Sequence, residues 1–174
     1  QAELWENSQA VLRENSHAVL RENSHAQCKS PYACGILKSI TAQCSGRRIG
    51  NEPIKAIDWL NSCSVPIKRG FVTLYKSVEK DFTTRNRISF KPRTKHEAPD
   101  WNPDFKEECG CGIHYSPSVA QARTFRDCDV YVACKVAVKD MADLPAFAEY
   151  PDKIRAKGGY TLYQVDKEGN KLGA

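Results

Sequence analysis

The sequence predicts a mostly β protein of the α+β class. We expect a short N-terminal parallel β-solenoid over residues 1–50, followed by a small α+β domain over residues 51–174. Three observations support this: an eight-residue repeat at the start, a second part in which strand-like segments outnumber helices, and a stretch containing Gly and Pro (residues 46–53) between them. A chain of 174 residues is long enough for two small domains.

The first residues repeat with a period of eight, as AELWENSQ, AVLRENSH and AVLRENSH. Two columns stay small or apolar through six units: Ala2, Ala10, Ala18, Ala26, Cys34 and Ala42, and, two positions later, Leu4, Leu12, Leu20, Cys28, Ile36 and Cys44. Positions two apart share one face of a strand, so both columns are expected to point inward. A long amphipathic helix is the alternative, but its apolar stripe would drift by about 80° in every repeat.

One octad is too short to close a coil, so we expect two units per coil, as strand, turn, strand and turn. Asn7, Asn15 and Asn23 are expected at the turns, because Asn tolerates left-handed backbone. The first coil would have an unpaired edge, which predicts that coils upstream in the chain, a second copy or a protein partner covers it. The chain also starts at Gln1 within the pattern, so we expect further residues upstream.

The second part contains short apolar patterns separated by polar and Pro-containing segments. They predict helices at 54–63 and 118–125, and strands at 71–78, 88–90, 112–116, 130–138, 153–156 and 160–165, the last two as a closing strand pair. The polar residues 91–108 are predicted as a long loop. Because helices do not alternate regularly with strands, the pattern favours α+β over a doubly wound sheet.

Cysteine content and hydropathy suggest where the protein works. The eight cysteines come without a visible secretory signal, which predicts reduced thiols in a cytoplasmic setting rather than a secreted protein. No run of about 18 apolar residues occurs, so we expect no membrane-spanning helix.

The densest group of reactive side chains lies in residues 108–117, Glu-Cys-Gly-Cys-Gly-Ile-His-Tyr-Ser-Pro. One hypothesis is a metal site with Cys109, Cys111 and His114 as ligands and Cys128 or Cys134 as a fourth. A second is a nucleophilic cysteine, Cys109 or Cys111, beside His114. A third is a ligand pocket at a strand-to-helix junction, where an anion would be favoured.

Several motifs in residues 68–168 resemble an uncharacterised family of phages and bacteria. They are Leu74-Tyr75-Lys76-Ser77-Val78, Asp100-Trp101, the run 108–117, Val132–Val138 and Lys153-Ile154-Arg155-Ala156. The octads are similar in style to repetitive prefixes of phage proteins. The resemblance implies no particular function. The open solenoid edge and the lack of a complete catalytic set favour a phage- or complex-associated protein located in the virion or the cytoplasm, with Tyr75, Asp100, Trp101 and Ser116 as candidate ligand-binding residues.

The order of elements also resembles the ADP-ribosyltransferase fold. That resemblance implies NAD as cosubstrate and catalytic roles for Lys76, His114, Tyr115 and Glu149. Glu149 would hold a ribose hydroxyl and stabilise an oxocarbenium-like transition state by its charge. Lys76 departs from the family, which carries His or Arg at this place.

A third function, nucleic-acid binding, is indicated by the cations Arg85, Arg87, Lys91, Arg93 and Lys95, among which Phe90 is interleaved. Three hypotheses therefore stand: a docking segment joined to a ligand-binding domain, an NAD-dependent transferase, and a nucleic-acid-binding module.

Overall fold

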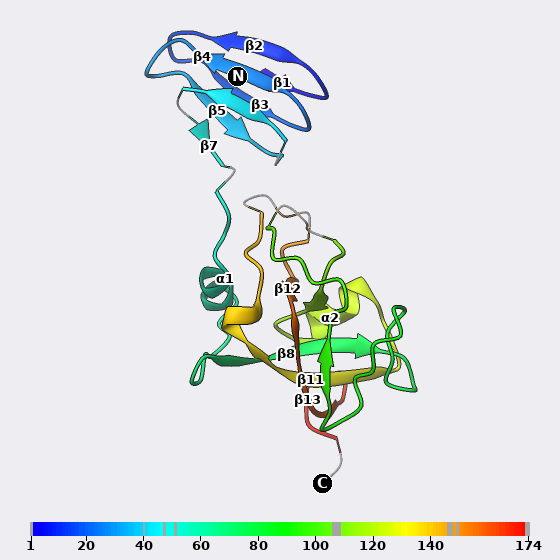
Figure 1. Cartoon of the computed structure of the whole chain (residues 1–174). Helices are drawn as coiled ribbons and strands as arrows, with labels where there is room; N and C mark the ends of the chain where they lie inside the picture. Colours follow the sequence, from blue (N-terminus) through cyan, green and yellow to red (C-terminus); the bar gives the residue numbers. More distant parts are fainter. Residues whose placement is uncertain are drawn as a thin grey trace. The chain divides into compact units, whose positions relative to one another are not determined.

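The computed structural model describes residues 2–39, 41–46, 48–50, 52–105, 109–145, 148 and 150–172 (Figure 1). The described part is mostly β with α+β character, as predicted. The chain divides into two compact units, Gln1–Pro53 with Pro145–Glu149, and Ile54–Leu144 with Tyr150–Ala174. Each unit is described by itself.

In the first unit, successive strands go alternately to two parallel sheets. One sheet has the order β1(Ala2–Leu4), β3(His17–Leu20), β5(Cys34–Leu37) and β7(Arg48–Ile49); the other has β2(Gln9–Leu12), β4(His25–Cys28) and β6(Gln43–Ser45). Leu20 and Ala18 are fully buried between the sheets, whereas Val11, between the two columns, is 54% exposed. The predicted inward and outward faces are therefore correct for β2 and β3, whereas Ala2 of β1, predicted to point inward, is exposed.

The eight-residue period does not persist through all six units, so this part of the prediction is wrong. In each turn a backbone N–H donates to the carbonyl oxygen of the residue three positions earlier. These accepting residues are Trp5, Arg13 and Arg21, which are eight positions apart, and then Ser30 and Ser39, each nine positions after the one before. Each later turn therefore holds one extra residue, and the inward columns slip. Ala18 pairs with Gly35, Leu20 pairs with Leu37, and Ala26 pairs with Cys44, in place of the predicted octad partners.

The turns are built differently from the prediction, although Asn7, Asn15 and Asn23 do occupy them. The left-handed residue is the preceding glutamate in each case: Glu6 (φ 53°), Glu14 (φ 50°) and Glu22 (φ 49°).

The second unit is built on an antiparallel sheet in the order β8(Phe71–Val78), β11(Val130–Ala137), β13(Gly158–Val165) and β9(Lys95–Glu97). A separate pair, β10(Ile113–Tyr115) and β12(Ile154–Ala156), meets the β8 edge through reciprocal backbone hydrogen bonds of Tyr75 and Ser116 (2.8 and 3.0 Å). The remaining elements are α1(Ala56–Ser62), α2(Val119–Phe125) and the short 3-10 helix η1(Val138–Asp140).

Three expectations for this unit need correction. The segments 153–156 and 160–165 do not pair with each other, because β12 pairs with β10 and β13 pairs with β11 and β9. The predicted loop 91–108 contains a strand, β9. The backbone of β9 lies so close to Gly158 that a Cβ atom there would be 2.3 Å from the carbonyl oxygen of His96. No strand covers 88–90, and Phe90 is buried against the His96 ring (4.1 Å between centroids).

Truncation of Leu20 tests the packing of the first unit. We expect Leu20→Ala to lower the free energy of unfolding of this unit by about 2–5 kcal/mol, because the deleted methyl groups leave a cavity between the two sheets. Val11→Ala is the control and should cost less than about 1 kcal/mol, since Val11 is half exposed. Hydrogen exchange of β3 and β5 amides in the full chain would measure both. Equal effects would contradict the assignment of the inward face.

Candidate functional site

A small cavity of about 200 Å³ lies where β8, β10, β12 and α2 meet. Its lining residues are Tyr75, Lys76, Ser77, His114, Ser116, Ala122, Phe125 and Lys153. Four of the sequence-predicted site residues, Tyr75, Lys76, His114 and Ser116, are thus brought together. They converge because the Tyr75–Ser116 bridge holds the end of β10 against the middle of β8.

Lys76 is the most unusual group of this cavity. No described side chain forms a hydrogen bond or ion pair with it. Burial lowers the pKa of its amine to about 8, and the nearby charges of Lys153 and Arg126 act in the same direction. Lys76 is half-buried by surface exposure, and its amine stays charged below pH 8. Lysines with a lowered pKa in a cleft are frequent in functional sites, and an uncompensated charge away from water costs stability.

Lys153 supplies a second amine from the start of β12. Its Nζ lies 4.1 Å from the centroid of the Tyr150 ring and 5.2 Å from that of Phe125, and it donates to Cys109 Sγ at 3.2 Å. The aromatic rings attract this amine, and among the described residues no acidic side chain forms an ion pair with it. The sequence-based site did not include Lys153, although a cation alternating with Ile154 in a short strand was a usable signal.

Tyr115 projects away from this cavity, as alternation along β10 requires. Its hydroxyl group is 2.7 Å from His96 Nε2, and the other ring nitrogen of His96 lies 3.2 Å from Thr161 Oγ1. All three side chains are buried. Burial, aided by the Lys76 charge, lowers the pKa of His96 to about 4, so this cluster is neutral and its geometry is that of a hydrogen-bonded core.

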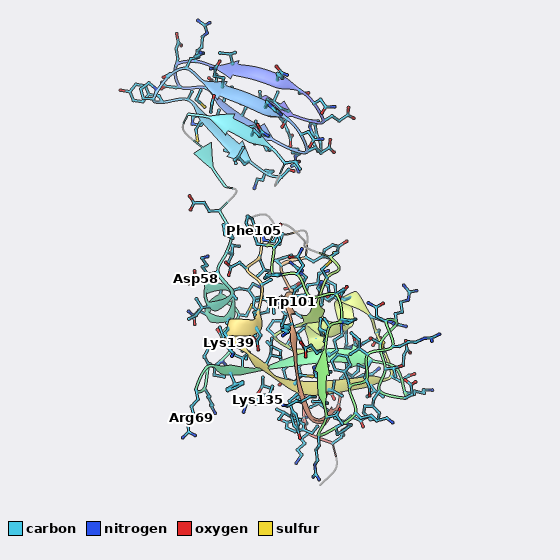
Figure 2. All side chains as sticks on the ribbon, viewed as in Figure 1. Asp58, Arg69, Trp101, Phe105, Lys135 and Lys139 are labelled. Atoms are coloured by element: carbon cyan, nitrogen blue, oxygen red, sulfur yellow. The ribbon has the colours of Figure 1, made fainter. Side chains whose placement is uncertain are left out.

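The other predicted site residues lie elsewhere. Asp100 is exposed and does not line the cavity, and Glu149 lies outside the described residues. Trp101, labelled in Figure 2, packs beside Gly112, where a Cβ would come within 3.0 Å of the indole ring. Trp101 and the glycine turn are therefore coupled by packing, and neither is part of the cavity wall.

The Cys-Gly-Cys-Gly run forms a turn, and the metal set proposed for it is not assembled. Within the described residues, no three His, Cys, Asp or Glu side chains are placed to hold one ion. Cys109 turns toward Lys153, Cys111 has a φ of 44°, and His114 lines the cavity.

Arg155 anchors this turn and was missed by sequence reasoning. It is 5% exposed, and its guanidinium donates to the carbonyl oxygens of Asn102 and Cys111, both at 2.9 Å. Backbone carbonyls satisfy this buried cation, so Arg155 holds the segment around Asn102 and the turn at Cys111, both of which precede β10. An arginine inside the apolar strand 154–156 was the available signal.

The pKa of Lys76 leads to a pH-dependent prediction of stability. Between pH 8 and 10.5 the unfolded lysine binds more protons than the folded one, so the stability penalty from this group is full below pH 8 and disappears toward pH 10.5. We expect Lys76→Met to raise the free energy of unfolding by about 1–3 kcal/mol at pH 7, with a gain that shrinks above pH 8.

Lys80→Met is the matched control, because the Lys80 side chain is 80% exposed. It should change the stability by less than about 0.5 kcal/mol at either pH. Chemical denaturation of each variant at pH 7 and pH 10 makes the measurement. An unchanged or reduced stability of Lys76→Met at pH 7 would contradict an uncompensated charge at this position.

Comparison with known proteins found no matching family model, no matching curated protein and no matching solved structure. None of the helices among the described residues combines the length and apolar character needed to cross a bilayer. The function therefore has to be argued from the geometry of the cavity.

Proposed function

We propose that the second unit is a ligand-binding domain that takes a small anionic ligand at Lys76. The observation that carries this proposal is the convergence of Lys76 and Lys153 on one cavity in which no described acidic side chain pairs with Lys76. A bound anion would supply the missing counter-charge. It would also account for the presence of a lysine that lowers stability, since binding sites often carry such a cost.

The remaining lining groups suit the same ligand. The hydroxyl groups of Tyr75 and Ser116 can donate to an anionic oxygen, and Ser77 and the His114 ring also line the cavity. A carboxylate or phosphate group would meet two amines and several neutral donors, a mixture that orients as well as attracts. The Phe125 ring and Ala122 would contact an apolar part of the ligand.

Cavity size does not favour the NAD-dependent alternative. Pockets that bury drug-sized ligands measure about 300–1,000 Å³. The cavity at Lys76 has about 200 Å³, which suits a fragment of metabolite size better than a dinucleotide. Tyr115 also lies in the core.

For the first unit we propose a short β-solenoid that serves in docking or self-association. Two observations support this. The strands alternate between two sheets and pair in parallel within each. In the first coils, Ala2 pairs with Ala18 and Ala10 pairs with Ala26, each sixteen residues on, which is the length of a coil of two octads. Among the described strands, β1 pairs only with β3 and β2 only with β4. Their outer backbone edges can pair with coils upstream in the chain, with a protein partner or with a second copy, as strand edges commonly do.

Anion binding is tested with inorganic phosphate and acetate in titrations followed by ¹H–¹⁵N NMR at low ionic strength. We expect the resonances of residues around Lys76, including Ser116, to shift, and Lys76→Met and Lys153→Met each to weaken binding at least about tenfold. Affinity should fall as the pH rises through 8, because Lys76 then loses its charge. Lys80→Met should bind normally; shifts spread over the surface, or binding that persists in Lys76→Met, would refute the site.

Self-association is tested separately by sedimentation of the full chain over a wide concentration range. We expect a concentration-dependent oligomer, since edge pairing is an intermolecular equilibrium. A monomer at every concentration would rule out self-association and leave coverage of the edge by another protein or by coils upstream in the chain.

A further inference from the structure

A second binding surface lies on the main sheet, on the face that α2 only partly covers. α2 packs over one end of this face through Val119, which contacts a cluster with Tyr131 and Val165. Toward the other end of the strands a groove of about 930 Å³ opens. Its lining residues are Phe71, Lys95, His96, Glu97, Lys135, Ala137, Lys139, Asp140, Lys157, Gly158, Gly159, Tyr160 and Leu162.

One row of paired residues crosses all four strands on this face. Thr73 of β8 pairs with Lys135 of β11, Lys135 pairs with Tyr160 of β13, and Tyr160 pairs with Lys95 of β9. Directly paired residues project to the same side of a sheet. Two lysines and an aromatic ring therefore stand side by side across the groove, although they are far apart in the sequence.

The groove is strongly basic. Its cations are Lys95, Lys135, Lys139 and Lys157, against the two acids Glu97 and Asp140. The Lys157–Glu97 ion pair (2.9 Å) neutralises one of each. An adjoining depression of about 480 Å³ shares Phe71 and Lys135 and adds Lys68 and Arg69 with no acid in its lining. Arg69, Lys135 and Lys139 lie in the same part of the unit in Figure 2.

Aromatic rings lie among these cations. Phe71 is 39% exposed, and Lys135 Nζ lies 4.1 Å from the centroid of its ring. Tyr160 is partly exposed in the row described above. An exposed aromatic ring flanked by amines offers a flat apolar face beside positive charge. Unpaired bases stack on such faces while their phosphates contact the amines.

We propose that this groove binds single-stranded nucleic acid. An acidic peptide would satisfy the lysines but would have no general need for the flat ring faces. A duplex keeps its bases stacked inside and cannot offer their faces to Phe71 or Tyr160. A single strand uses both features of the groove. This site is independent of the anion cavity at Lys76.

The groove contains Lys95 of the basic segment expected from the sequence, but none of that segment's other cations. In that segment Phe90 was the ring among the cations, but Phe90 is fully buried and packs on His96. Arg85 and Arg87 lie in the turn region after β8, do not line the groove, and are exposed. They therefore provide a matched control with the same change of charge.

The test measures binding of a labelled single-stranded DNA or RNA oligonucleotide of about ten nucleotides to the full chain by fluorescence anisotropy. We expect binding at low salt that weakens steeply as salt rises, because phosphate contacts release counterions. Lys135→Glu/Lys139→Glu should weaken it at least about tenfold, and Phe71→Leu by about 5- to 100-fold. Arg85→Glu/Arg87→Glu should change it by less than about threefold, as expected for charges outside the contact.

Ultraviolet crosslinking of the unmodified protein gives a second measurement that does not depend on the folding of a variant. The crosslinked peptides should contain Phe71 or Tyr160. Any of three results would overturn the proposal: no binding of single strands at low salt, equal binding of duplex DNA or polyglutamate, or a loss in Arg85→Glu/Arg87→Glu as large as that in the groove variant.

Discussion

The pairing of β8 with β11 is the constraint on which the second unit depends. The two strands run antiparallel and in register from Phe71 opposite Ala137 to Val78 opposite Val130. Strand alternation then sends Phe71 and Tyr75 to the side that α2 partly covers, and Leu74 and Lys76 to the other. Because β11 also pairs with β13, this register places Thr73, Lys135 and Tyr160 side by side on the face that carries the groove.

Polar groups have hydrogen-bond partners in the core next to the Lys76 cavity, whereas Lys76 itself has no described side-chain partner. His96, Tyr115 and Thr161 satisfy one another, so burial makes them neutral and rigid. Lys76 receives no such partner from the described side chains and retains an amine whose pKa is near 8. A fold can bury the first kind of group for stability alone, whereas the second kind lowers stability unless something binds to it. This contrast is the reason for placing function at Lys76.

Much of the architecture could be predicted from local pattern. The octad with its alternating inward and outward residues indicated paired parallel strands, and segments such as 71–78, 118–125 and 130–138 were recognisable because alternation and helical periodicity are local properties. Lys76, His114 and Ser116 could be selected because they lie beside strong strand and turn signals. The slip from eight to nine residues per unit was harder to see, since the later turns around Ser30 and Ser39 no longer contain the Glu-Asn pair.

The sequence by itself determined the class of the fold, the segments that become strands, and a short set of reactive residues. Only the tertiary structure decided which of them meet. Tyr115 went to the core and Lys153 to the cavity, while the row from Thr73 through Lys135 and Tyr160 to Lys95 joined four distant segments. The physical reason is that strand partners are chosen by non-local pairing, which burial and backbone hydrogen bonding across the whole sheet decide, and which no local pattern specifies.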